Sequence, residues 1–328
     1  MTLRKLFLVG LSLFAFVSEA NSGEDTLNTQ ARDAITRSLP FLWKEGQAWI
    51  DQRGCISCHQ VPYMVWSLDA AASHGFEVDK DRLAKLKVWS TQIENFDNPK
   101  NRLDRTESDQ AEANIDTMTH LLLALGKSEH VPDSNWQQKF ADYLIVSQNE
   151  NGTWKPCGQL PFQKRSKEET TDATTTWTAL ALMQQGKESD LKVPVEKITH
   201  NILKDGKSTE WWAAQLLLSK QRNDPARVRE LTEKLVSFQN EDGGWGWLID
   251  EESDAFGTGI AIYALGRVET TQQVEVVNRA VQFLVETQTE DGSWLVRSTK
   301  AKHQKQVTPT AIYWGTAWAV IGLLETQN

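Results

Sequence analysis

Two cysteines and a histidine form the most distinctive chemical spacing in the chain, in the pentapeptide at 55–59 with Cys55, Cys58 and His59. Two thiols at this spacing can each form a thioether to one vinyl group of a haem, and the histidine that follows can ligate the iron. The same spacing suits a redox disulfide or half of a zinc site. Cys157 is the only other cysteine and the remaining histidines are scattered, which argues against zinc. We therefore predict covalent haem c, with His59 as an iron ligand.

Single aspartates are the second group of residues that could do chemistry. Asp116, Asp172 and Asp254 each stand near the start of an expected apolar helix. A carboxylic acid held in a preorganised polar cluster can protonate a substrate. The same position also suits a helix cap or a first-turn carboxylate. Asp172 and Asp254 are the candidate catalytic acids, and the capping role stays open for both.

The N-terminal segment has the pattern of an export signal. Arg4 and Lys5 precede an apolar run at 6–17, and small residues end at Ala20. This pattern predicts a signal peptide at 1–20, cleaved after Ala20, followed by a linker at 21–29. The apolar run is too short for a stable membrane span. We expect a periplasmic or secreted protein, which is the setting in which bacteria attach c-type haem.

Composition narrows the class of protein. The chain has 328 residues, 40% of them hydrophobic, and a formal net charge of −9. This apolar content supports one large core, and the acidic balance argues against nucleic acid as a partner. Tryptophan is unusually frequent, with 14 residues, which suggests a repeat that uses it.

Three copies of the pattern Gln-x-x-x-Gly-x-Trp occur at 148–154, 239–245 and 288–294. Each copy follows a stretch with apolar residues at helical spacing and leads into a more apolar helix. Weaker pairs of helices complete a set of six, so the sequence predicts an all-α (α/α)6 toroid over 30–328, with six inner and six outer helices. The expected inner helices span 56–73, 111–125, 172–185, 209–220, 254–265 and 309–324.

These segments resemble the QW repeats of squalene–hopene and oxidosqualene cyclases, whose α/α toroid is shared with protein prenyltransferase β subunits. The resemblance covers nearly the whole chain from about residue 30. It implies that a cyclase would protonate an alkene with the central aspartate of an Asp-x-Asp-Asp motif, which this sequence lacks. A prenyltransferase would need a zinc set of Asp, Cys and His, which the chain does not supply either. The toroid alone does not transfer an activity.

The long connections from outer to inner helices, at 97–110, 149–170, 240–253 and 290–307, should lie on one rim, where sites are usually built. The pentapeptide occupies the same connection in the first pair, so we expect haem at the mouth of the toroid. His303 shares that rim and is a candidate for the second iron ligand. Aromatic residues on the inner helices either line an apolar cavity or fill the core: Tyr63, Trp66, Trp177, Trp211, Phe256, Tyr263, Tyr313, Trp314 and Trp318.

Three hypotheses about function follow. The first is an exported haem protein on a cyclase-like toroid, which serves electron transfer with a redox partner or redox chemistry on an apolar ligand. The second is a haem-free, terpenoid- or squalene-cyclase-like isomerase acting on a polyprenoid. The third is a non-catalytic barrel that binds a lipid or a partner and whose cysteines form only a disulfide. The sequence favours the first and leaves open whether the chain is an enzyme.

Overall fold

The computed structural model describes residues 8–56, 59–99, 105–126, 135–195, 197–198, 204–268, 273–303 and 305–327, with side chains from residue 25 onward. Within these residues the secondary structure is helical, apart from isolated β-bridges between loops. The all-α fold class predicted from the repeats is confirmed.

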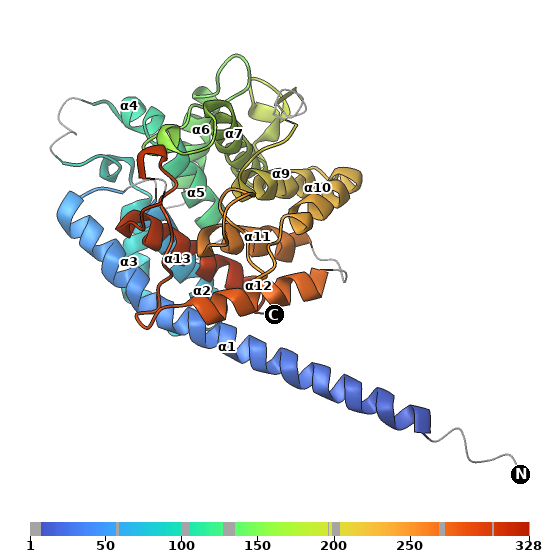
Figure 1. Ribbon diagram of the computed structural model, residues 1–328. Helices are drawn as coiled ribbons and strands as arrows, with labels where there is room; N and C mark the ends of the chain where they lie inside the picture. The colour runs from blue at the N-terminus through green and yellow to red at the C-terminus, as the bar shows by residue number, and fades with distance from the viewer. Residues whose placement is uncertain are drawn as a thin grey trace, which may run out of the picture.

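Inner helices form a closed ring (Figure 1). Each packs against the next along the chain, and the last packs against the first. They are buried on almost every side; in the last helix every residue from Tyr313 to Leu324 is buried. The ring confirms the predicted toroid. Its helices are α2 (Val61–Ser73), α5 (Ile115–Leu125), α7 (Lys167–Gln184), α9 (Thr209–Gln221), α11 (Ala255–Val268) and α13 (Pro309–Leu324).

Outer helices surround this ring and bury only one face. In the most amphipathic of them, Ala280, Val281 and Leu284 are buried. The expected outer helix at 194–204 lies largely outside the described residues. A short extra helix, α4 (Glu107–Glu112), stands in a long loop. The described outer helices are α1 (Leu8–Arg53), α3 (Lys80–Ser90), α6 (Trp136–Val146), α10 (Pro225–Ser237) and α12 (Val274–Thr287).

The repeated tryptophan ties each outer helix to its inner partner. The indole Nε1 of Trp154, Trp245 and Trp294 donates to the carbonyl oxygen ten residues earlier, over 2.6, 2.8 and 2.8 Å. The backbone N–H of each tryptophan donates to a threonine hydroxyl of the following inner helix. The glycine of each repeat has φ between +81° and +89°, a conformation that favours glycine.

The repeated glutamine ties each pair to the next outer helix. Gln239 Nε2 donates to the carbonyl of Val276 on α12, over 2.8 Å. Gln288 Nε2 donates to the carbonyl of Ala34 on α1, over 2.9 Å, and so joins the last repeat to the first. The same atom donates to the hydroxyl of Ser38 over 2.9 Å. These bonds close the toroid.

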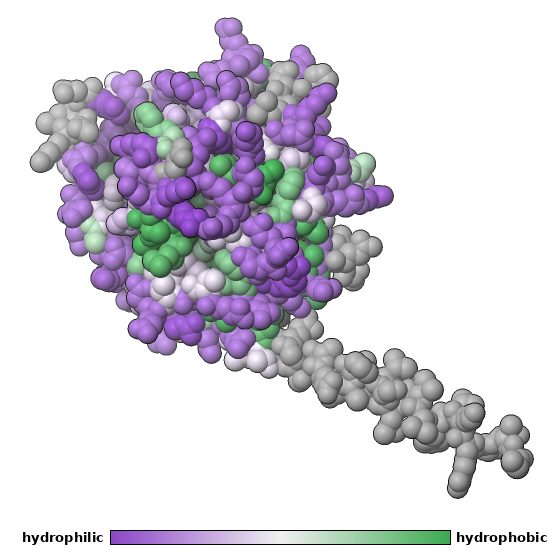
Figure 2. Space-filling model, viewed as in Figure 1, coloured by the Kyte–Doolittle hydropathy of each residue, from purple (hydrophilic) through white to green (hydrophobic). Residues whose placement is uncertain are grey.

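The rim loops contact one another as the sequence predicts. Lys164 N–H donates to the carbonyl of Thr299 over 2.8 Å, and Thr209 N–H donates to that of Trp247 over 2.9 Å. The described surface is mainly hydrophilic in the view of Figure 2. Three of the exposed large apolar side chains, Phe162, Leu295 and Val307, belong to these loops.

Candidate functional site

A buried carboxyl group, Asp116, stands in the first turn of α5. Its Oδ1 accepts a hydrogen bond of 3.0 Å from the Thr174 hydroxyl, and its Oδ2 accepts one of 2.9 Å from the Cys157 N–H. The residue is 3% exposed. Burial raises the pKa of Asp116 to about 7, against the opposing effect of the two hydrogen bonds. The group can therefore carry a proton near neutral pH.

A charged cluster lies beside Asp116 and is built from the N-terminal ends of α7 and α9. Arg165 Nη1 pairs with Glu210 Oε2 at 2.9 Å and donates to the Ser208 hydroxyl over 3.1 Å. Glu169 Oε1 accepts from both the N–H and the hydroxyl of Ser208, over 2.7 and 2.6 Å. All four side chains are buried. Glu210 raises the pKa of Asp116 and Arg165 lowers it, so the two charges of this ion pair act on Asp116 in opposite directions.

A neutral base, His120, lies one helical turn from Asp116 on the same face of α5. Its Nε2 is 3.0 Å from the Tyr63 hydroxyl, and its Nδ1 forms no hydrogen bond of regular geometry with the described residues. Burial lowers the pKa of His120 to about 4 and raises that of Tyr63 well above its usual value. The pair is therefore uncharged at neutral pH and able to accept a proton.

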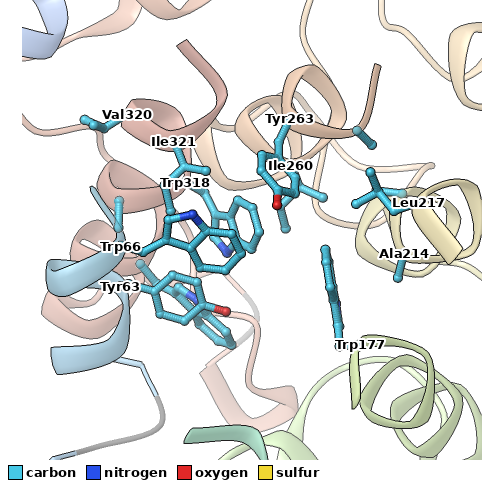
Figure 3. Close-up of a cluster of buried hydrophobic side chains, with 14 of the residues drawn as sticks. Tyr63, Trp66, Trp177, Ala214, Leu217, Ile260, Tyr263, Trp318, Val320 and Ile321 are labelled. Atoms are coloured by element: carbon cyan, nitrogen blue, oxygen red, sulfur yellow. The ribbon is translucent and has the colours of Figure 1, made fainter. Parts of the chain in front are cut away.

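Aromatic rings from four inner helices gather around Tyr63 (Figure 3), and the rings of Trp66 and Trp177 lie 6.5 and 6.3 Å from that of His120. Trp66 lies with its ring centroid 5.5 Å from Trp318 and 5.5 Å from Tyr263, and Trp177 lies 6.0 Å from Trp318. The rings are buried, and the indole N–H groups of Trp177 and Trp318 form no hydrogen bond of regular geometry with the described residues. We call Tyr63, Trp66, Trp177, Tyr263 and Trp318 the aromatic cluster. Its π faces can stabilise a cation.

The two predicted acids lie in different settings from Asp116. Asp254 caps α11: its Oδ1 accepts from the Gly257 N–H over 2.7 Å and its Oδ2 from the Trp247 N–H over 3.1 Å. Burial raises the pKa of Asp254 to about 6. The catalytic role of Asp254 stays a prediction.

The sequence suggested that Asp172 opens an inner helix, and the structure shows that it does not. The Ser166 hydroxyl caps α7 by accepting from the Glu169 N–H over 3.1 Å, so the helix begins at Lys167 and Asp172 lies in its second turn. Asp172 is buried two residues before Thr174, the partner of Asp116. Its catalytic role also stays a prediction.

The pentapeptide is incorporated into the toroid at the rim. His59 is 3% exposed, and its ring nitrogens lie 2.8 and 3.0 Å from Gln159 Nε2. Burial, helped by the Lys300 charge, lowers the pKa of His59 to about 3. Cys55 is half-buried, and Cys58 lies outside the described residues.

His303 lies on the same rim, as predicted, and is half-buried. Its Nδ1 is 3.1 Å from Gln306 Oε1. His303 and Gln159 line a common cavity of about 180 Å³. Within the part of the chain that the structure describes, no three His, Cys, Asp or Glu side chains are grouped so as to hold a metal ion. The iron-ligand role of His303 stays a prediction.

Comparison with known proteins bears on both the fold and the chemistry. No protein-family model matches the chain. A drimenyl diphosphate synthase from Streptomyces showdoensis is 37% identical over 82 residues, which is 25% of this chain and 15% of that protein. The similarity thus spans only a small part of the relative.

Solved structures match over most of the chain. A type II terpene cyclase from Scytonema, in complex with its product merosterolic acid A, has a TM-score of 0.56 and 13% identity, covering 92% of this chain and 98% of that one. An unsaturated glucuronyl hydrolase from Bacillus sp. GL1 has a TM-score of 0.57 and 11% identity, covering 91% and 96%. A glycosyl hydrolase family 88 protein from Bacteroides vulgatus has a TM-score of 0.54 and 13% identity, covering 92% and 99%. The chain shares the α/α toroid fold of these enzymes.

The haem-protein function favoured by the sequence is wrong. The structures that share the fold over most of the chain are hydrolases and a terpene cyclase, not haem proteins. The expected redox partner has no support from them. Covalent attachment at Cys55 and Cys58 is itself untested, because Cys58 lies outside the described residues. Cleavage after Ala20 and export also stay predictions. Among the described residues, no helix is both long and apolar enough to span a membrane, in line with the expectation from the sequence.

Proposed function

We propose that the toroid is an acid–base catalyst of the terpenoid-cyclase type, which isomerises or cyclises an apolar polyprenoid. The observation that carries the proposal is Asp116, a buried carboxyl with a pKa raised to about 7 that lies beside the aromatic cluster. The segment similar to drimenyl diphosphate synthase supports the same class. An interior built mainly from tryptophan and tyrosine rings favours an apolar ligand.

The first step is protonation of an alkene by Asp116. The carboxyl O–H bond breaks, a C–H bond forms with the π electrons of the alkene, and a carbocation results. The carboxylate left behind is held by the N–H of Cys157 and the hydroxyl of Thr174. These donors are in place before the reaction, so the charge on Asp116 develops in a preorganised environment.

The aromatic cluster then stabilises the carbocation. Its five rings come from α2, α7, α11 and α13 and meet inside the ring of helices (Figure 3). A cation over an aromatic face gains about 0.5–2 kcal/mol, and more where water is excluded. The rings also keep water from quenching the cation, because their side chains are buried.

The last step is loss of a proton to the Tyr63–His120 pair. A C–H bond of the carbocation breaks, its electrons form a new alkene, and the proton ends on His120. Protonated His120 lies one turn from the Asp116 carboxylate on α5, so the two opposite charges attract. Release of this proton from His120 to solvent and uptake of a solvent proton by Asp116 restore the starting state.

The test is turnover of prenoids in D₂O by the purified full chain. Squalene, farnesol and farnesyl diphosphate are incubated with the protein, and products are analysed by mass spectrometry. We expect a cyclic or isomerised product with one solvent deuterium at the protonated carbon. Asp116→Asn should lower turnover by about 10²–10⁴-fold, the usual contribution of a general acid.

The matched control is Asp142→Asn, on the exposed face of α6, which should leave turnover unchanged. Melting temperatures of both variants report whether the toroid remains folded. An unsaturated glucuronyl disaccharide is assayed in parallel, because two of the similar structures are glycoside-cleaving enzymes by their names. Hydrolysis of the disaccharide without any prenoid product would overturn the proposal.

A further inference from the structure

A separate cavity of about 180 Å³ opens at the rim, between Gln159 and the start of α13. Its polar lining residues are Gln159, Ser298, Thr299, Lys300, His303, Thr308 and Thr310. None of the described residues that line it carries a carboxylate. A wall of cationic and hydroxyl groups without acids is suited to an anion.

Lys300 supplies a positive charge that is not neutralised locally. Two other cations of the rim are paired: Lys164 lies 2.6 Å from Glu251, and Arg297 lies 2.6 Å from Glu252. Within the described residues, no carboxylate lies within 4.0 Å of Lys300 Nζ. The Lys300 charge acts toward the interior, since it lowers the pKa of His59. A bound anion would neutralise this charge.

The N-terminus of α13 adds to the positive potential. The Thr308 hydroxyl caps the helix by accepting from the Ala311 N–H, over 3.4 Å. Thr310 and Ala311, in the first turn, line the cavity. The partial positive charge at a helix N-terminus favours phosphate groups. Here it acts together with the ammonium of Lys300.

Trp314 connects this cavity with the aromatic cluster. It lines the cavity, yet its ring centroid lies 5.9 Å from Tyr63 of the cluster and 4.7 Å from Phe256. The side chain is 6% exposed, and its indole N–H is buried without a hydrogen bond of regular geometry to the described residues. One side of the residue therefore faces a polar cavity and the other an apolar interior.

We propose that this cavity binds the phosphate or diphosphate head group of an amphiphilic prenoid, whose hydrocarbon tail passes Trp314 into the aromatic cluster. The proposal rests on the proposed function, because it names the substrate class of the same toroid. It makes Lys300 the principal contact of the head group and Trp314 the contact of the first isoprene unit.

The first test is binding of inorganic pyrophosphate and of orthophosphate to the full chain, by isothermal titration calorimetry at constant ionic strength. We expect Lys300→Ala to weaken pyrophosphate binding by about tenfold or more, as for loss of a hydrogen bond to a charged group. The matched control is Lys302→Ala, an exposed residue two positions away that does not line the cavity. Equal weakening by both variants, or no binding by the wild type, would overturn the head-group site.

The second test separates a prenyl ester from a free anion. Farnesyl diphosphate should bind more tightly than either pyrophosphate or farnesol, because it fills both the cavity and the apolar interior. Trp314→Ala should weaken the binding of farnesyl diphosphate by a larger factor than that of pyrophosphate, and so reduce this advantage. Pyrophosphate binding as tight as that of farnesyl diphosphate would show a free-anion site and overturn the proposal.

The binding assays are repeated with Asp116→Asn. Binding by this variant shows the head-group site even if the chain proves not to turn over prenoids. Turnover of squalene without any pyrophosphate binding would support the proposed function and refute the head-group site. These outcomes distinguish failure of the head-group site from failure of the proposed function.

Discussion

Asp116 and His120 lie four residues apart on α5, so that a carboxyl group with a raised pKa and an imidazole with a lowered one share a single helix face. Opposite shifts in two neighbouring groups are the pattern expected of an acid and a base that exchange a proton with a substrate. The third member, Tyr63, contacts His120 from the adjacent inner helix α2, over 3.0 Å. The proposed chemistry depends on this relationship.

The base should control which product forms. In His120→Gln, Asp116 can still protonate the alkene, but the carbocation lacks its proton acceptor. We expect turnover of the substrate to persist and the product mixture to shift toward other alkene isomers or an alcohol. Gas chromatography with mass spectrometry measures the proportions of these products. Trp136→Phe, a conservative change at a buried ring on outer helix α6, is the control for general loosening. An unchanged product mixture in His120→Gln would exclude His120 as the base.

The pH profile should have two limits. Asp116 has its pKa raised to about 7, so its acid form is lost as pH rises through 7. His120 has its pKa lowered to about 4, so the neutral base is lost as pH falls through 4. We expect turnover to be highest between these values. Rates measured across the acid, neutral and alkaline ranges test this, and activity that keeps rising in alkaline buffer would contradict it.

The free energy of unfolding should depend on pH because the pKa of Asp116 is raised in the folded state. The folded-state pKa of Asp116 lies above its unfolded value, so the fold binds the proton more tightly. Its contribution to stability is complete below about pH 4 and is lost as pH rises through 7. Asp116→Asn removes this dependence, so the free energy of unfolding of the variant relative to wild type should increase from acid to mildly alkaline pH. Urea titrations at both extremes measure it, and a difference independent of pH would count against a buried, protonated Asp116.

Closure of the ring can be tested at Gln288. Its amide bonds to Ala34 and Ser38 join the last repeat to the first. Gln288→Ala removes these hydrogen bonds, at a cost of about 0.5–1.5 kcal/mol for each in the free energy of unfolding. Gln282→Ala, on the exposed side of α12, should change it by less than about 0.5 kcal/mol. Equal effects of the two variants in urea unfolding would argue against the closing contact.

Two glycines allow the cost of backbone strain to be compared with the cost of close packing where the first and last repeats meet. Gly75 has φ +77° with open space where a Cβ would stand, whereas Gly292 has φ +81° and a Cβ there would collide with the Arg37 carbonyl. Gly75→Ala should cost about 1–2 kcal/mol, the penalty of the left-handed conformation. Gly292→Ala should cost clearly more, as measured by denaturant unfolding. Similar losses would mean that the first and last repeats are not tightly joined there.

The sequence predicted the toroid well because its signals are local. Trp154, Trp245 and Trp294 recur with fixed neighbours, and each makes the same indole bond ten residues back. The apolar inner helices could each be recognised from their own segment of sequence. Six helix pairs can bury their apolar faces together by closing into a toroid.

The site was harder to predict because its partners are distant in sequence. Asp116 acquires its raised pKa from burial, and its hydrogen bonds come from Cys157 and Thr174, 41 and 58 residues away. The sequence pattern included Asp116 among three aspartates but favoured Asp172 and Asp254 as acids, and it did not point to His120, although the spacing of Asp116 and His120 on one apolar helix was a usable signal. The pentapeptide favoured a haem-protein function that the similar structures do not share. A short spacing match carries no information about the fold around it.

Deuterium incorporation is the most direct test of the central claim. Wild-type protein, Asp116→Asn and Asp142→Asn are incubated in D₂O with squalene and farnesyl diphosphate. The account predicts a product one mass unit heavier, formed by wild type and Asp142→Asn and lowered by about 10²-fold or more in folded Asp116→Asn. Absence of any deuterated prenoid product from the wild type, or full activity of Asp116→Asn, would contradict it.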